Sequence, residues 1–197
     1  MMKLLLVVLL TLPVIANAQN VIDWDPNYKL NISDFQSGAT AIGEGAGNIY
    51  SLHSSARMDF SFSMSNYEFM FTKNFNSKVN CTFTRDAASL IAPDEKIAEC
   101  LLRFARYEFD LSELYARKFR KKLFESKGAF SSASFFRPIF DELQKEYVDR
   151  HGNAAKETDI GRNEAKLAEL HFEVLGEIDE LVEFCKTCKP PKRRKKS

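Results

Sequence analysis

The side chains best suited to nucleophilic, acid–base or metal chemistry are few in this sequence and lie far apart. The three histidines are His53, His151 and His171, and none has another His four residues away or a Cys close by. Because a zinc site needs three or four protein or water ligands, we interpret each His as a surface or hydrogen-bonded residue. The sequence also has no Gly-x-Ser-x-Gly motif and no phosphate-binding loop, since the Gly-rich segment 43–47 follows no convincing strand and opens no helix.

The four cysteines allow three pairings, among which spacing alone does not choose. Cys185 and Cys188 have the spacing of a redox or half-zinc motif, but they lie at a chain end without a strand–helix–strand context. We therefore favour a local disulfide or free thiols over redox catalysis. Cys81 ends a strand-like run and Cys100 lies in a helix-like run 19 residues later. A Cys81–Cys100 bridge between strand and helix is the pairing that we prefer.

The first half of the chain has the patterns of β-strands. Residues 24–35 are expected to form an N-terminal strand, and the Gly-rich residues 38–48 a loop or weak strand. Apolar and polar residues then alternate over 58–64 and again over 67–71, with a two-residue turn at Ser65 and Asn66 between them. Residues 79–84 alternate in the same way. These runs predict a small antiparallel sheet.

The second half has helical periodicity. A helix is expected to begin after Pro93, where Asp94 and Glu95 suit a helix N-terminus, to run to about residue 126 and to stop at Gly128. Glu113 and Arg117, four residues apart, are expected to form an ion pair on one face of this helix. Two more helices are predicted over about 135–150 and 164–185, with Gly152 and Asn153 between them. Strands followed by helices indicate an α+β fold.

The long helix carries a resemblance to a known family. Residues 101–123, LLRFARYEFDLSELYARKFRKKL, resemble the signature helix of the bacterial secreted family of predicted zinc-dependent proteases (domain of unknown function 922). That helix typically reads LL-x-HE-x-x-HFD followed by ELYAR. The flanks at 101–102, 109–110 and 113–117 are intact here, and residues 24–35 also look like the opening strand of the family. The resemblance implies a zincin-like layout, in which a small antiparallel sheet packs on a former active-site helix and two C-terminal helices follow.

The positions that would carry the chemistry of that family depart from its pattern. The resemblance places the first metal-binding His on Phe104, the catalytic Glu on Ala105 and the second His on Glu108. Two His four residues apart on a helix can bind one Zn²⁺, and the Glu between them takes a proton from the metal-bound water. Phe104 has no lone pair to donate, and Ala105 cannot transfer a proton.

A second stretch, residues 157–163, resembles the family segment that has a His before Gly and Asn, and Ile160 replaces that His. Glu108 offers one carboxylate, which does not make a zinc site by itself. We expect Glu108 instead to pair with a nearby Arg on the helix surface. No catalytic, metal-binding or cofactor-binding residue is therefore predicted.

The N-terminus is typical of an exported protein. Residues 1–18 are expected to be a signal peptide, with Lys3 in the basic region, an apolar run over 4–12 and a small-residue cleavage site at Ala16-Asn17-Ala18. No later window approaches 18 uncharged apolar residues, so no transmembrane segment is expected. The predicted location is periplasmic or extracellular.

Charge is distributed unevenly although the formal net charge is only +1. The last twelve residues contain seven basic residues and no acid, whereas residues 19–185 contain 20 basic and 27 acidic residues, a charge of about −7. The acidic body makes nucleic acid a poor partner. Residues 19–185 are expected to form a single α+β domain, and residues 186–197 a disordered basic tail that either solubilises the protein or binds an anionic envelope surface.

These observations favour a non-enzymatic protein of the cell envelope, a pseudo-peptidase with a binding or structural role and no cofactor. The alternative is a hydrolase with a displaced or non-standard metal site. Neither the partner nor the oligomeric state follows from the sequence.

Overall fold

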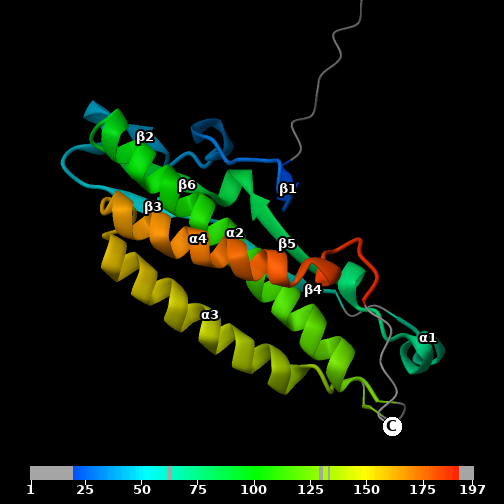
Figure 1. The fold of residues 1–197 in the computed structure, drawn as a ribbon. Helices are drawn as coiled ribbons and strands as arrows, with labels where there is room; N and C mark the ends of the chain where they lie inside the picture. Colours follow the sequence, from blue (N-terminus) through cyan, green and yellow to red (C-terminus); the bar gives the residue numbers. More distant parts are fainter. Residues whose placement is uncertain (1–19, 62–63, 129–130, 133, 191–197) are drawn as a thin grey trace, which may run out of the picture.

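The computed structural model describes residues 20–61, 64–128, 131–132 and 134–190 of the chain (Figure 1). The predicted signal peptide, residues 1–18, lies outside the described residues. The architecture is α+β, as predicted: short strands come first, and three long helices follow them along the chain.

The strands form two small sheets rather than one. In the first, β5 (Val79–Thr84) lies between β1 (Val21–Asp23) and β4 (Arg57–Phe60), and both pairings are antiparallel. In the second, β6 (Ser89–Ala92) pairs in parallel with β2 (Ala41–Ile42) and antiparallel with β3 (Ser51–His53). The parallel pair makes the second sheet mixed.

Strand β5 has the alternation that its sequence predicts. Val79, Cys81 and Phe83 are buried, and the residues between them are half-buried. Because successive side chains of a strand point to opposite faces, the buried set packs against the long helix while the polar set faces away. This strand therefore attaches the first sheet to the helical layer.

Two of the predicted strands are wrong. Residues 24–35 form no strand, because β1 ends at Asp23 and the chain then turns. Asn31 caps a single 3₁₀ turn, Ile32–Asp34. The buried Asp34 carboxylate in this turn accepts hydrogen bonds from the Asn31 backbone and from Arg85. Residues 67–71 belong to a helix, α1 (Asn66–Phe71), which begins because the Ser65 hydroxyl caps the Glu68 backbone N–H at 3.1 Å. Their apolar spacing also fits one turn of helix, so alternation alone was misleading.

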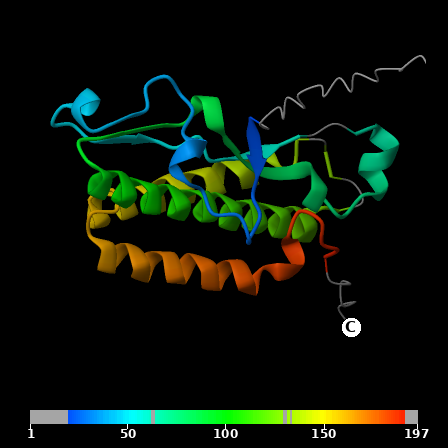
Figure 2. The same cartoon turned by 90° about the horizontal axis from the view of Figure 1, so that it is seen from above.

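The long helix α2 (Glu95–Ser126) confirms its prediction at both ends. Asp94 is the N-cap and accepts a hydrogen bond from the Ile97 backbone at 2.8 Å. The helix has 32 residues, of which 19 are buried. The strands lie on one side of α2 and α4 lies on the other, while α3 runs alongside α2 (Figures 1 and 2). A helix enclosed in this way is buried around most of its circumference.

The two C-terminal helices are α3 (Arg137–Thr158) and α4 (Glu164–Glu180), followed by a 3₁₀ turn, Val182–Phe184. The predicted break at Gly152 and Asn153 is wrong, because both residues lie inside α3. The chain reverses instead after Asp159 and Ile160, which both have positive φ. Gly161 is required next, since a Cβ there would lie 2.3 Å from the Cys100 carbonyl oxygen.

A network of charged side chains on α2 is buried in the core. The Glu113 carboxylate accepts hydrogen bonds from Arg117 at 2.9 Å and from Arg120 at 2.8 Å, and all three side chains are at least nine-tenths buried. Arg120 also donates to the carbonyl oxygens of Val79 at 2.8 Å and Phe184 at 3.0 Å. The predicted pair of Glu113 and Arg117 is thus present, but it lies in the core. It ties β5 and the C-terminal 3₁₀ turn to α2.

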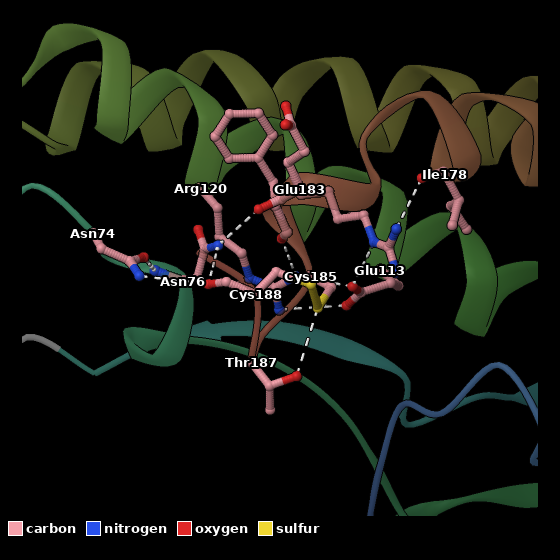
Figure 3. The surroundings of a disulfide bond; sticks show 11 residues. Asn74, Asn76, Glu113, Arg120, Ile178, Glu183, Cys185, Thr187 and Cys188 are labelled. Atoms are coloured by element: carbon pink, nitrogen blue, oxygen red, sulfur yellow. Dashed lines mark hydrogen bonds and ion pairs between the residues drawn. A yellow bond between two sulfur atoms is a disulfide. The ribbon is translucent and has the colours of Figure 1, made fainter. Parts of the chain in front are cut away.

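The cysteine pairing differs from the preferred one. Cys185 and Cys188 form a local disulfide (Figure 3), whereas Cys81 and Cys100 are buried free thiols. Cys81 lies against the carbonyl of Phe109, at 3.7 Å, and Phe109 is nine residues beyond Cys100 on the same helix, or about 14 Å along its axis. A disulfide needs Cα atoms about 4–7 Å apart. The predicted Cys81–Cys100 bridge is therefore wrong.

The first residues of the predicted tail, 186–197, contact the rest of the protein. Lys186 forms an ion pair with Asp23 at 2.8 Å, and the Cys188 carbonyl accepts a hydrogen bond from the Asn76 side chain at 3.0 Å. These residues belong to the body, and residues 191–197 lie outside the described part of the chain. Among the described residues no helix is long and apolar enough to span a membrane.

The buried network predicts a large cost for losing its central cation. Arg120→Met removes the charge while keeping much of the volume, and it leaves the Glu113 carboxylate and two carbonyls poorly paired in the core. We expect a loss of about 3–5 kcal/mol in the free energy of unfolding, measured by urea denaturation. Lys121→Met, at an exposed position on the same helix, should change it by no more than about 0.5 kcal/mol. Equal effects of the two substitutions would contradict the importance of the network.

Candidate functional site

The helix positions that the resemblance assigns to a metal site are filled by core residues. Phe104 is 1% exposed and Ala105 is fully buried. The Phe104 ring lies 5.7 Å from the ring of Tyr107 and 5.8 Å from that of His151, measured between centroids. Gly161 lies directly against the Phe104 Cβ. The positions where the family pattern has an imidazole and a general base therefore form an apolar contact between α2, α3 and the turn after α3.

Ile160 lies in that same turn. It is half-buried, packs on the hydrophobic core and has a φ of 50°. Because its neighbour Gly161 contacts Phe104, the two stretches that carry the resemblance meet in space although more than fifty residues separate them. Within the described part of the chain, no group of three or more His, Cys, Asp and Glu side chains is placed to hold a metal ion.

Glu108 has a different partner from the one that we expected. Its carboxylate binds the His151 ring nitrogen Nε2 from α3, rather than an Arg on the helix surface. Glu108 is buried, and its second oxygen, Oε2, has no hydrogen-bond partner among the described residues. The hydrogen bond to Glu108 raises the pKa of His151, and this effect outweighs burial, which acts in the opposite direction.

Hydroxyl groups complete this interface between α2 and α3. The Ser112 hydroxyl donates to the Glu108 carbonyl at 2.9 Å and lies 3.3 Å from the Tyr147 hydroxyl. The Tyr147 ring stacks on His151 with centroids 5.9 Å apart. Burial raises the pKa of Tyr147 to about 12, so its hydroxyl stays neutral at physiological pH. The cluster is a structural polar contact inside the helical layer.

A second site lies on a different side of α2. A cleft of about 660 Å³ opens between the N-terminal segment (residues 24–30), α2 and α4. Its volume is within the range of small-molecule binding sites. Most of its wall is apolar and comes from side chains of all three elements: Trp24, Leu30, Phe109, Leu167, Leu175 and Ile178.

The polar centre of the cleft is Asp110. Its carboxylate accepts a hydrogen bond from the Trp24 indole at 2.7 Å through Oδ1, and it binds His171 Nε2 at 2.7 Å through Oδ2. Because a carboxylate only accepts, Nε2 carries the hydrogen and the orientation of the imidazole is set. No described residue forms a hydrogen bond with the other ring nitrogen, Nδ1, so this nitrogen of His171 can form a hydrogen bond with a bound molecule.

Two arginines of α2 line the cleft beside Asp110. Arg106 donates to the Leu30 carbonyl at 2.8 Å, which attaches the N-terminal segment to α2. Arg103 pairs with Glu164 at the start of α4 at 2.6 Å. Polar contacts thus hold both walls of the cleft to α2.

The chemistry of the cleft is set by its apolar wall and by the oriented His171 imidazole. Among the described lining residues there is no Ser, Thr or Cys that His171 could activate as a nucleophile. An oriented imidazole in an apolar cleft can instead accept from, or donate to, one polar group of a bound molecule.

Sequence reasoning missed both His–carboxylate pairs. His151 lies 43 residues from Glu108, and His171 lies 61 residues from Asp110, so no local spacing joins them. The one available signal was the unchanged Phe109-Asp110 flank beside the altered metal positions.

Comparison with known proteins adds no relative. No family model matches this chain, and neither a curated protein nor a solved structure matches it significantly.

The Glu108–His151 pair predicts a specific dependence of stability on pH. The folded-state pKa of His151 is raised above its unfolded value of about 6.5, so the stabilisation is fully present below that value and is lost as the pH rises through the folded pKa. We expect the free energy of unfolding of the wild type, relative to His151→Gln, to fall over this interval. Urea denaturation at a series of pH values measures it.

Glu108→Gln is the matched control, because it keeps the side-chain shape and removes the charge that raises the His151 pKa. It should flatten the same part of the pH profile. An unchanged profile in both variants would mean that the pair does not contribute to folding.

Proposed function

We propose that this chain is an exported, non-enzymatic binding protein of the cell envelope. In this proposal it is a pseudo-peptidase that keeps a zincin-like scaffold while the metal site of the zinc-dependent protease family is lost. The observation that carries the proposal is the packing of Phe104 and Ala105, which occupy the ligand and base positions with buried side chains that have no donor atoms.

The carboxylate at the second ligand position supports the same proposal. Glu108 would be the one remaining ligand, but it is engaged with His151 and held within the α2–α3 interface. Adding a metal there would require displacing the Phe104 ring, which contacts both His151 and Tyr107. The side chains around Glu108 therefore form a packed interface between α2 and α3.

The binding role belongs to the cleft between the N-terminal segment, α2 and α4. It combines an apolar wall with the oriented pair of Asp110 and His171, a combination found in sites that bind small molecules or side chains. The ligand that suits it has an apolar body and one group that hydrogen-bonds with the His171 imidazole.

One observation favours the alternative, a hydrolase with a non-standard metal site. The Glu108 oxygen Oε2 is buried beside a histidine and has no hydrogen-bond partner within the described ranges, and such an atom is a candidate metal ligand. Two side chains fall short of the three or four ligands of a zinc site, so we rank this function second.

The cleft contains a natural reporter, because Trp24 is the only tryptophan of the chain. We expect the fluorescent probe 1-anilinonaphthalene-8-sulfonate, which combines an apolar ring system with one sulfonate group, to bind the folded protein and to quench Trp24 emission by energy transfer. Ala168→Phe fills the cleft from α4 and should weaken this binding at least about tenfold, through lost volume rather than lost fold. A fluorescence titration measures it.

Glu173→Phe is the matched control, because it adds the same side chain at an exposed position of α4 outside the cleft. It should leave the titration unchanged. Equal weakening by both variants, or binding unaffected by Ala168→Phe, would contradict a ligand site in the cleft.

A further inference from the structure

We propose that the cleft binds an unbranched carboxylic acid, with its carboxylate at Arg106 and His171 and its hydrocarbon chain directed toward Trp24 and Ile178. The inference rests on the binding role proposed above, and it names the class of ligand and its orientation. Three observations carry it: the length of the cleft, the distribution of charge along it, and the lack of free backbone groups in its helical walls.

The length of the cleft follows from contacts between its two helical walls. Three of these contacts are spaced seven residues apart on both helices, so α2 and α4 run parallel in a fixed register. They are Arg103 with Glu164, Asp110 with His171, and Arg117 with the Ile178 carbonyl. Seven helical residues rise about 10.5 Å, so the contacts span about 21 Å. A cleft of about 660 Å³ extended over this length is narrow and admits one extended chain.

The N-terminal segment covers the same length in the opposite direction. The Leu30 carbonyl accepts a hydrogen bond from Arg106 at 2.8 Å, near the start of α4. The Trp24 indole donates to Asp110 at 2.7 Å, and its ring centroid lies 5.3 Å from the Arg117 guanidinium. The cleft therefore has one end at Leu30 and the other end at Trp24.

Charge differs between these two ends. Three basic residues line the end at Leu30, namely Lys29, Arg103 and Arg106. The acid that lines this end, Glu164, is paired with Arg103 at 2.6 Å. The end at Trp24 is lined by Asp25 and Asp179, and the described lining residues include no basic side chain there. An anionic group is therefore attracted to the end at Leu30 and repelled from the end at Trp24.

Two donors near the basic end can hold a carboxylate. Arg106 lies four residues before Asp110, on the same face of α2, and so beside the Asp110–His171 pair. Its Nε atom donates to Leu30 and its Nη1 atom lies 3.5 Å from Glu99, which leaves Nη2 without a hydrogen bond to any described residue. With Asp110 on Nε2, an imidazole that carries both protons donates from Nδ1. A carboxylate accepts from both groups through charge-assisted hydrogen bonds.

The rest of the cleft suits a hydrocarbon chain better than a peptide. Beyond His171 its wall is apolar and includes Trp24, Phe109, Leu175 and Ile178. The backbone groups inside α2 and α4 are already paired within each helix, so an extended peptide between these walls would bury amide groups without partners. A hydrocarbon chain has no polar group to satisfy. The occupant that fits both ends of the cleft is therefore a chain with a single carboxylate.

The test is isothermal titration calorimetry of residues 19–197 with three ten-carbon probes: decanoate, 1-decanol and decyltrimethylammonium. We expect decanoate to bind at least about tenfold more tightly than 1-decanol, and the cation to bind most weakly. Residues 19–185 carry about −7, so attraction by net charge alone would favour the cation. A preference for decanoate therefore reports the local basic end.

Arg106→Gln should weaken decanoate binding at least about tenfold and leave 1-decanol binding unchanged. The 1-decanol titration shows whether the cleft keeps its shape, because Arg106 also binds the Leu30 carbonyl. Arg106→Lys keeps the charge and should recover most of the decanoate affinity. Lys166→Gln is the matched control, since it removes a positive charge near the start of α4 from a residue outside the cleft lining. It should leave all three titrations unchanged.

Equal affinity for decanoate and 1-decanol would overturn the inference. An equal loss of both in Arg106→Gln would also overturn it, because Arg106 would then only shape the cleft. Binding of 1-anilinonaphthalene-8-sulfonate that Ala168→Phe weakens, without binding of decanoate, would overturn the carboxylic acid and leave the ligand site in place. Failure of every probe, 1-anilinonaphthalene-8-sulfonate included, would remove the proposed binding function as well.

Discussion

The fold depends on the enclosure of α2, a 32-residue helix that carries charged side chains into the core. A buried carboxylate must be paired, because the cost of removing it from water otherwise exceeds what packing returns. Three carboxylates on α2 are paired, the buried Glu108 and Glu113 and the half-buried Asp110, and through these pairs α2 is joined to other parts of the chain. Glu108 holds α3 through His151, and Asp110 holds α4 through His171 and the N-terminal segment through Trp24. Glu113 orients Arg120, which binds β5 and the last 3₁₀ turn.

This arrangement explains why the metal-site positions of the resemblance and the cleft lie on different sides of one helix. Phe104 and Glu108 face α3 and the turn at Gly161, where close packing leaves the helices in contact. Asp110 faces α4 and the N-terminal segment, where the walls stand apart. Phe104 and Ala105 are packed into the core on one side of α2, and the cleft lies open on the other side. In our proposal this second side carries the function.

Local patterns in the sequence predicted the elements whose surroundings are uniform along their length. The bounds of α2 follow from Asp94 and from a long apolar stripe, and β5 follows from the alternation over residues 79–84, because each element has one consistent relation to the core. Residues 67–71 were misjudged because five residues fit both a strand and a helical turn, and the Ser65 cap decided the outcome. Gly152 failed as a break because α3 continues beyond it to Thr158, and Ala154 and Thr158 are buried there.

Local sequence patterns could not predict contacts between residues that lie far apart in the chain. The partners of Glu108 and Asp110 come from α3 and α4, and only the right crossing of those helices brings the imidazoles to the carboxylates. The preferred cysteine bridge failed for the same reason, since the register of β5 on α2 places Cys81 beside Phe109 rather than beside Cys100. The absence of zinc-binding side chains at Phe104 and Ala105, by contrast, is a property of residue identity and was readable directly.

The central claim of our proposal is that this scaffold holds no catalytic metal. The most direct measurement is the zinc content of the folded protein after equilibrium dialysis against zinc and removal of unbound metal. The account predicts no stoichiometric zinc in the wild type, and none in Phe104→His, because Ala105 and Ile160 supply no further ligand. One tightly held zinc per chain in the wild type, lost in His151→Gln or Glu108→Gln, would contradict it and would assign the Glu108–His151 pair to a metal site.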